Sequence, residues 1–186
     1  MNREANFRKL FHFELILVII AFSLAPWVVV KLHSQEVPSK KDCAFCSPEV
    51  LNRQTLYESE QTLVLSNDRP LLPGHSMVIP KRHVARYEQL TAEEHEEIRL
   101  TIHKVKQAFE EVYGTDEYLL VLQNGRKAGQ TVSHVHFHMI PRMETNALTK
   151  VRLWLSILSN SPLLTSPLNE EQLEEMYGAL KAALNQ

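Results

Sequence analysis

Three histidines alternate with apolar residues in one short stretch of the chain. His134, His136 and His138 lie two residues apart from one another. Successive side chains of a strand point to opposite faces, so a strand over 132–140 would place all three imidazoles on one face. Strict alternation of this kind serves no packing purpose. We therefore interpret the stretch as a functional face rather than as a half-exposed strand with incidental histidines.

Two kinds of site fit three imidazoles on one face. They could converge on a metal ion, or one of them could attack a phosphate while its neighbours stabilise charge. A metal enzyme that binds through histidine alone usually also needs an acidic residue to activate water, and residues 134–138 contain none. This stretch therefore favours phosphate chemistry.

The only two cysteines form a separate motif. Cys43 and Cys46 have the two-residue gap that lets both thiolates bind one zinc ion. Alone they supply half of such a site. A redox pair would normally open a helix in a βαβ unit, and the surrounding sequence does not indicate one.

The stretch 129–142 (GQTVSHVHFHMIPR) resembles the signature of the histidine-triad family of nucleotide hydrolases and transferases. Upstream, 67–75 (NDRPLLPGH) and 78–83 (VIPKRH) are similar in order and spacing to the nucleoside-binding half of that family. The resemblance covers about residues 43–142. It excludes the apolar N-terminus and the C-terminal segment.

The resemblance implies a catalytic set. His136 would attack the α-phosphate of a nucleotide and form a covalent nucleotidyl-histidine, which water then hydrolyses. His134 would help to hold the tautomer of the nucleophile, and His138 and His75 would approach the phosphate oxygens. Gln130 would donate a hydrogen bond to the phosphate. This scheme requires no catalytic metal.

The same resemblance implies which residues bind the nucleotide. Asn67 occupies the position that grips the ribose hydroxyls, and Thr131 can donate to the phosphate or the leaving group. Gln123 lies where an amide side chain reaches the phosphate side. The implied substrates are dinucleoside polyphosphates or nucleoside phosphoramidates, and we expect an adenine nucleotide.

Bacterial members of the family often complete a Cys-x-x-Cys pair with two histidines. The matching positions here are His83 and His134, so the resemblance implies a structural zinc site made by Cys43, Cys46, His83 and His134. Zinc would tie the N-terminal segment to the sheet. Members of the family are commonly twofold dimers, so a homodimer is also expected.

The elements around these motifs predict an α+β domain at residues 43–142. A long helix is expected between Thr91 and Gly114, because Thr91 and Glu94 have capping-box spacing and an apolar stripe follows. The expected strands lie at 55–57, 62–65, 75–79, 118–122 and 132–140. We therefore predict a HIT-like antiparallel sheet with the long helix packed on it.

The N-terminus carries an apolar run, residues 15–30, without a charge. This run predicts an N-terminal hydrophobic helix, so we assign residues 1–32 to a membrane anchor, ranked above a signal sequence, and 33–42 to a polar linker. The expected protein is membrane-anchored through a single span at residues 15–32. Basic residues flank both ends of the run and leave its orientation open, and the nucleotide substrate slightly favours the cytoplasmic side.

A C-terminal helical extension is expected at residues 143–186. Its predicted helices cover 147–158 and 169–184, and Asn169 is the N-cap of the second helix. Apolar residues recur at helical spacing in the second helix, which predicts a packing role.

The overall charge excludes one class of partner. The 186 residues include 20 Lys and Arg against 22 Asp and Glu, a net charge of -2. This balance provides no broad positive field for a nucleic-acid backbone, so we expect no nucleic-acid partner. Three hypotheses stay open: a membrane-tethered nucleotide hydrolase or transferase, a membrane-tethered nucleotide-binding sensor, and a non-catalytic zinc-binding protein.

Overall fold

The computed structural model describes residues 43–143, 151 and 167–186. The chain divides into two compact units, Met1–Val37 and Pro38–Gln186, and every described residue belongs to the second. The elements, in chain order, are η2 (Ala44–Cys46), α2 (Pro48–Gln54), β1 (Thr55–Glu58), β2 (Thr62–Ser66), β3 (Ser76–Pro80), η3 (Tyr87–Gln89), α3 (Ala92–Tyr113), β4 (Tyr118–Leu122), η4 (Arg126–Ala128), β5 (Phe137–Pro141) and α5 (Glu170–Leu184).

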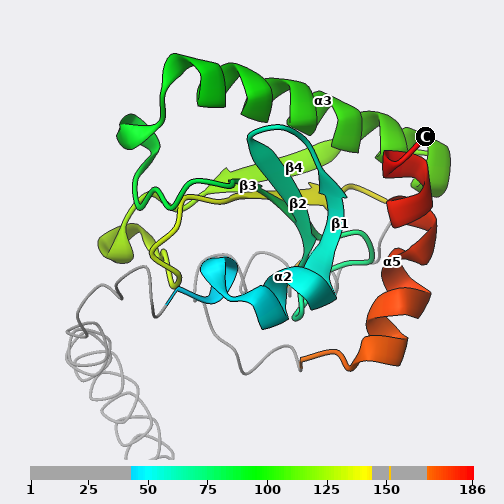
Figure 1. The fold of residues 1–186 in the computed structure, drawn as a ribbon. Coiled ribbons are helices and arrows are strands. Elements are labelled where there is room, and N and C mark those ends of the chain that lie inside the picture. The colour runs from blue at the N-terminus through cyan, green and yellow to red at the C-terminus, as the bar shows by residue number, and fades with distance from the viewer. Residues whose placement is uncertain (1–42, 144–150, 152–166) are drawn as a thin grey trace, which may run out of the picture. The chain divides into compact units, whose positions relative to one another are not determined.

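The five strands form one sheet in the order β1-β2-β3-β5-β4, and every neighbouring pair is antiparallel (Figure 1). The predicted antiparallel α+β architecture is therefore confirmed. The pairing of β3 with β5 sets Met77 opposite His138. Residues opposite each other in a sheet share a face, so the end of the triad lies on the same side as Met77.

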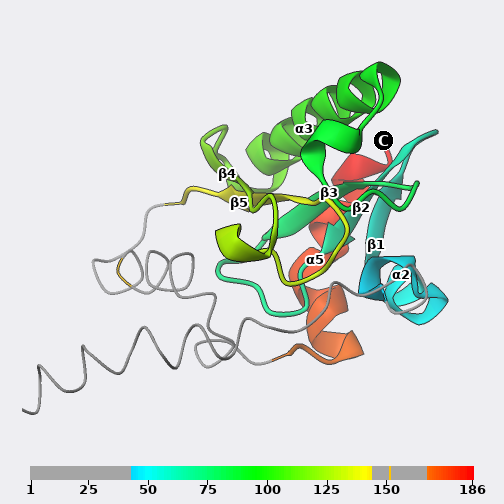
Figure 2. The ribbon, with the colours of Figure 1, turned by 90° about the vertical axis from the view of Figure 1, so that its left-hand side faces the viewer.

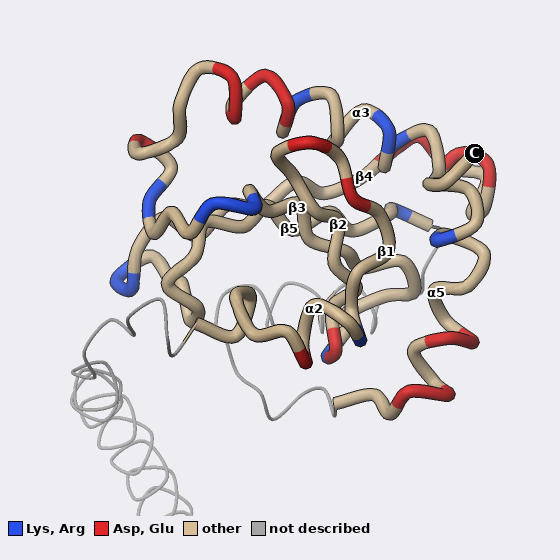
Figure 3. The backbone as a smooth tube through the Cα atoms, in the orientation of Figure 1, with Lys and Arg blue, Asp and Glu red and all other residues tan. Residues whose placement is uncertain are grey.

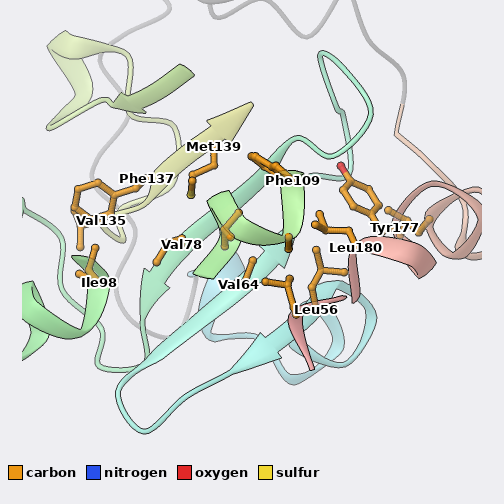
Figure 4. Packing of buried hydrophobic residues seen from close by; sticks show 14 of the residues in the cluster. Leu56, Val64, Val78, Ile98, Phe109, Val135, Phe137, Met139, Tyr177 and Leu180 are labelled. Atoms are coloured by element: carbon orange, nitrogen blue, oxygen red, sulfur yellow. The ribbon is translucent and has the colours of Figure 1, made fainter. Parts of the chain in front are cut away.

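The two faces of the sheet pack against different helices. Val64 and Val78 point into a core shared with α3 and α5, where Phe109 and Leu180 are fully buried (Figure 4). The residues on either side of Val64 in β2 and of Val78 in β3 pack with η2 and α2 on the other face. Both faces are covered, which explains why every residue of β2 and β3 is buried and why these strands are almost continuously apolar.

The long helix α3 begins and ends as the sequence predicts. Thr91 Oγ1 accepts a hydrogen bond from the Glu94 backbone at 3.2 Å, and the Glu94 carboxylate accepts one from the Thr91 backbone at 2.9 Å. Gly114 ends the helix in the left-handed conformation, with φ of 67°. The helix runs along one face of the sheet, as Figures 1 and 2 show.

The C-terminal helix α5 belongs to the same core. Asn169 caps it by accepting from the backbone of Gln172 at 2.9 Å, as predicted. Its buried side chains are Leu173, Tyr177, Leu180 and Leu184. The helix contacts α3 and β1 at the edge of the sheet (Figure 1). The boundary between the predicted domain at 43–142 and the extension at 143–186 stays a prediction, and the predicted helix at 147–158 lies outside the described residues except at Val151.

The predicted strand at 132–140 is wrong in its first half, because β5 begins only at Phe137. The pairings with β3 and with β4 both end at Phe137. Before it, Val135 donates to the backbone oxygen of Val84 in the segment that follows β3. His134 and His136 therefore lie in an irregular segment. The imidazoles of this segment still point away from its apolar side chains. Helix α2 was not predicted.

The predicted localisation requires correction. None of the helices within 43–143 and 167–186 is long and apolar enough to cross a bilayer, so the membrane-anchored location assigned from the sequence is not upheld. The apolar run, the N-terminal hydrophobic helix and the linker predicted within residues 1–42 lie outside the described residues.

Candidate functional site

His136 is held in one tautomer by the main chain. Its Nδ1 lies 2.6 Å from the carbonyl oxygen of His134, and a carbonyl can only accept, so Nδ1 carries the proton. The lone pair is then on Nε2. Burial lowers the pKa of His136 below its usual range, which keeps this imidazole neutral near neutral pH. A neutral imidazole with one fixed lone pair can act as a nucleophile.

His138 is oriented by His75 through a second chain of hydrogen bonds. The backbone N–H of Leu71 donates to His75 Nδ1 at 3.1 Å, so the proton of a neutral His75 is on Nε2. That N–H donates to His138 Nδ1 at 3.0 Å, which leaves the proton of His138 on its own Nε2. The ring centroids of His138 and His136 are 4.9 Å apart. The His136 ring, with a lone pair on Nε2, therefore lies beside the His138 ring, with an N–H group on Nε2.

Burial disfavours the protonated, charged form of both His75 and His138. Desolvation, with a smaller contribution from His136, lowers the pKa of His75 to about 3. Desolvation also lowers the pKa of His138 well below its usual range, with His75 and His136 adding to the effect. His75 is buried, and its Nε2 lies 3.0 Å from His138 Nδ1. Its predicted contact with phosphate oxygens stays a prediction.

Asn67 lies beside the same nitrogen of His75 that faces His138. Its Oδ1 accepts from the backbone N–H of Arg69 at 2.8 Å, and this contact fixes the orientation of the amide. The amide nitrogen then lies 3.3 Å from His75 Nε2, and because both atoms carry hydrogen this contact is not a hydrogen bond. Asn67 is half-buried, so part of the side chain is open to a ligand. The structure therefore places Asn67, His75, His138 and His136 next to one another in that order, and their roles toward a nucleotide stay predictions.

The four predicted metal ligands also converge. One ligand atom from each of Cys43, Cys46, His83 and His134 lies within 4.8 Å of the others. The Nδ1 atom of His134 is 3.6 Å from each sulfur, and the Nδ1 atom of His83 is 3.3 Å from Cys46 Sγ. Two thiolates and two imidazoles at such distances are a donor set typical of tetrahedral zinc.

The surroundings of this cluster fit a metal ion. His134 Nε2 donates to the carbonyl oxygen of Pro80 at 2.9 Å, so the lone pair of its Nδ1 faces the cysteines. Desolvation, with Cys46 adding to it, raises the pKa of the Cys43 thiol to about 11. A buried thiolate here therefore needs a cation close by. The residues present fit a structural zinc ion.

Phe45 joins the two clusters, and it was not predicted from the sequence. Its ring packs edge-on against His136, with centroids 5.3 Å apart, and against His134 at 6.1 Å. Its place between the two cysteines was the available signal, because a metal bound by Cys43 and Cys46 would also hold the residue between them.

The other predicted binding residues lie in the connection between β4 and β5. Gln130 Oε1 accepts from the Gly125 backbone at 2.7 Å and its Nε2 donates to the Ala85 carbonyl at 3.0 Å, so its amide fastens two loops together. Thr131 is exposed and Gln123 is half-buried. Within residues 43–143, no hydrogen bond joins Gln123, Gln130 or Thr131 to a triad imidazole. Their roles toward phosphate stay predictions.

Basic residues gather at the end of the molecule where the loops after β3 and β4 lie (Figure 3). Arg86 joins these loops by donating to the Asn124 carbonyl at 3.0 Å. Two of the others are paired, Lys81 with Glu58 and Arg82 with Glu94, each at 2.6 Å. These paired side chains hold the loops in place, so we assign them no separate role in attracting an anion.

The chain matches known proteins over the region that carries this site. The family described as HIT domain matches residues 49–145. A bis(5'-adenosyl)-triphosphatase from Dictyostelium discoideum is 40% identical over 89 residues, which are 48% of this chain and 60% of that protein. Across the first three curated relatives, the match spans between 51% and 60% of the relative's own length.

Solved structures agree with the sequence match. The diadenosine triphosphate hydrolase of Plasmodium falciparum, solved with cyclomarin A, is 26% identical with a TM-score of 0.57, covering 72% of this chain and 77% of that one. A zinc-bound histidine triad family protein from Mycobacterium smegmatis is 25% identical with a TM-score of 0.58, covering 80% and 96%.

Proposed function

Since the chain belongs to the HIT domain family, we propose that it is a nucleotide hydrolase that acts at the α-phosphate of dinucleoside polyphosphates, with His136 as its nucleophile. The observation that carries the proposal is the tautomer of His136, whose Nδ1 proton is engaged by the His134 carbonyl while Nε2 is left with a lone pair. The names of the curated relatives support an adenine dinucleotide as the substrate.

His136 and His138 have different roles in the first step. His136 Nε2 attacks the α-phosphorus, so that a P–N bond forms while the P–O bond to the leaving group breaks. His138 donates from Nε2 to a phosphate oxygen or to the departing oxygen, where negative charge grows. His75 keeps this proton on the outer nitrogen by donating to His138 Nδ1 at 3.0 Å.

The second step releases the nucleotide. Water attacks the phosphorus of the nucleotidyl-histidine and gives up one proton to solvent, the P–N bond breaks, and the electron pair returns to His136 Nε2. A diadenosine polyphosphate thereby gives adenosine monophosphate and a shortened nucleotide. A nucleoside phosphoramidate would follow the same route with an amine as the leaving group.

Zinc has a structural part in this proposal. Cys43, Cys46, His83 and His134 would hold it, and a bound ion would supply a cross-link between three segments of the chain. His134 then serves both sites, because its ring faces the cysteines while its carbonyl oxygen accepts the His136 proton. No step of the reaction passes through the metal.

We also propose the homodimer expected from the family resemblance. β4 is an edge strand of the sheet, and its Leu120 is 45% exposed. Leu100 on α3 is 48% exposed. Sedimentation velocity of the wild type and of Leu120→Glu tests this assembly: a dimer that the substitution dissociates supports it, and a monomeric wild type contradicts it.

The experiment that tests the proposed function compares His136→Asn with the wild type on diadenosine triphosphate. Loss of the nucleophile should lower kcat by at least about 1,000-fold. Intact-protein mass of the wild type, quenched during turnover, should show one added nucleoside monophosphate, and the variant should show none. The matched control is His103→Asn, because His103 is an exposed histidine on α3.

Other outcomes separate the remaining hypotheses. Turnover that survives in His136→Asn would remove this residue as the nucleophile. Tight nucleotide binding without product would indicate a sensor. A chain that binds zinc and no nucleotide would be a non-catalytic zinc protein.

A further inference from the structure

Tyr177 of α5 reaches the backbone of the loop that joins β2 to β3. Its hydroxyl lies 2.7 Å from the carbonyl oxygen of His75 and 3.1 Å from that of Asn67. A tyrosine hydroxyl has one proton, so the shorter contact is the main one and the Asn67 carbonyl shares it. Tyr177 is 2% exposed and its ring lies beside Leu180 in the core (Figure 4). Bulk water therefore cannot replace this donor.

A second contact ties the C-terminal segment to the same loop. The backbone N–H of Leu168, just before α5, donates to the Asp68 carbonyl at 2.8 Å. Arg53 of α2 reaches both partners, with Nη1 3.4 Å from the Leu168 carbonyl and Nη2 3.9 Å from the Asp68 carboxylate. The backbone carbonyls of loop residues 67, 68 and 75 thus all accept hydrogen bonds from the C-terminal segment.

This loop carries two residues of the candidate site. Asn67 and His75 lie at its two ends, and the Asn67 N–H closes it by donating to the His75 carbonyl at 3.1 Å. Tyr177 therefore donates its hydrogen bond to the carbonyl oxygen of His75, the residue that orients His138. A displacement of the His75 backbone would change the distance between its Nε2 and His138.

We propose that Tyr177 is a positioning residue of the candidate site, acting through the backbone of His75 and Asn67. Its kinetic consequence rests on the proposed function, whereas its effect on the histidines does not. Tyr177 lies beyond residues 49–145, the part of the chain that matches the HIT domain. The proposal therefore makes the C-terminal helix a working part of the site as well as a part of the core.

The first test reads the histidines directly. Nitrogen-15 NMR of imidazoles distinguishes a protonated nitrogen from one with a lone pair, so it reports the tautomers of His75 and His138 in the full chain. Tyr177→Phe removes only the hydroxyl. We expect the His75 and His138 signals to shift or broaden toward a mixture of tautomers.

Two control variants make this test specific. Tyr113→Phe also removes a buried hydroxyl, and its ring lies against Gly74 of the same loop, but among the described residues that hydroxyl has no hydrogen-bond partner. Leu184→Ala destabilises α5 without touching the loop. Both controls should keep the wild-type histidine signals. If Tyr177→Phe keeps them too, or if a control changes them equally, the proposal is overturned.

The second test is kinetic. Loss of one buried hydrogen bond that orients the site should lower kcat/KM for diadenosine triphosphate about 3- to 30-fold in Tyr177→Phe, below the unfolding temperature. Tyr113→Phe should stay within about twofold of the wild type. An unchanged kcat/KM in an active enzyme contradicts the proposal. If the wild type hydrolyses no nucleotide, the proposed function fails, and the NMR comparison still decides the role of Tyr177.

Discussion

Single main-chain groups set the chemistry of the histidines. The His134 carbonyl, the Pro80 carbonyl and the Leu71 N–H each engage one imidazole nitrogen and thereby fix a tautomer. The sequence could identify the imidazoles, because side-chain type and spacing carry that information. It could not identify their tautomers, because a backbone group looks the same at every position of a sequence.

Buried neutral imidazoles also make the stability depend on pH. The pKa of His75 is about 3 in the folded chain, against an ordinary value of 6.5. Between these values the unfolded chain binds more protons, so the free energy of unfolding is at its full value above about pH 6.5 and falls as the pH decreases. His75 alone contributes up to about 1.4 kcal/mol per pH unit within this window.

Urea unfolding between about pH 5 and about pH 7 measures this slope. His75→Gln removes the titrating group, so its free energy of unfolding should fall less steeply with decreasing pH than that of the wild type. His103→Gln, at an exposed position, should keep the wild-type slope. Equal slopes in all three proteins would mean that folding does not lower the pKa of His75.

Helices whose ends are marked by capping residues were predictable from the sequence. Thr91 and Asn169 form capping boxes, which are visible as residue pairs three positions apart. The irregular segment before β5 was not predictable, because it is held by hydrogen bonds to Val84 and Pro80, which are distant in the sequence. Tyr177 was not among the apolar positions assigned to the packing face of α5, and helical spacing carries no information about the partner of its hydroxyl.

Helix α5 should contribute to stability as a core element. Leu180 is fully buried between α5 and the sheet, so Leu180→Ala should lower the free energy of unfolding by about 2 to 5 kcal/mol. The matched control is Lys181→Ala on the exposed side of the same helix turn, with an expected change below about 0.5 kcal/mol. Chemical denaturation measures both, and equal effects would contradict the packing described for α5.

At the scale of the whole molecule, the cysteine and histidine cluster connects distant parts of the chain. It joins η2, the segment after β3 and the segment before β5. A zinc ion bound there stabilises the folded chain because the separated ligands of an unfolded chain bind it weakly.

Removal of zinc should therefore lower the melting temperature by about 10 °C, the shift expected from about 4 kcal/mol in a domain of this size. Metal analysis should find one zinc per chain in the wild type. Cys46→Ser should bind little zinc, and its melting temperature should not respond to a chelator. A zinc-free wild type whose melting temperature also ignores added zinc would contradict the site.

The strand order has a consequence for how the chain reaches this structure. β3 and β5 are neighbours in the middle of the sheet, yet α3 and β4 lie between them in the sequence. The ends of a long segment must meet before this pairing can form, which predicts slow folding. Cys43 and His134 are 91 residues apart. We expect them to come together only after that pairing, so zinc should leave the refolding rate nearly unchanged and slow unfolding instead. Stopped-flow refolding and unfolding with and without a chelator would reveal a zinc-dependent refolding rate if the cluster formed first.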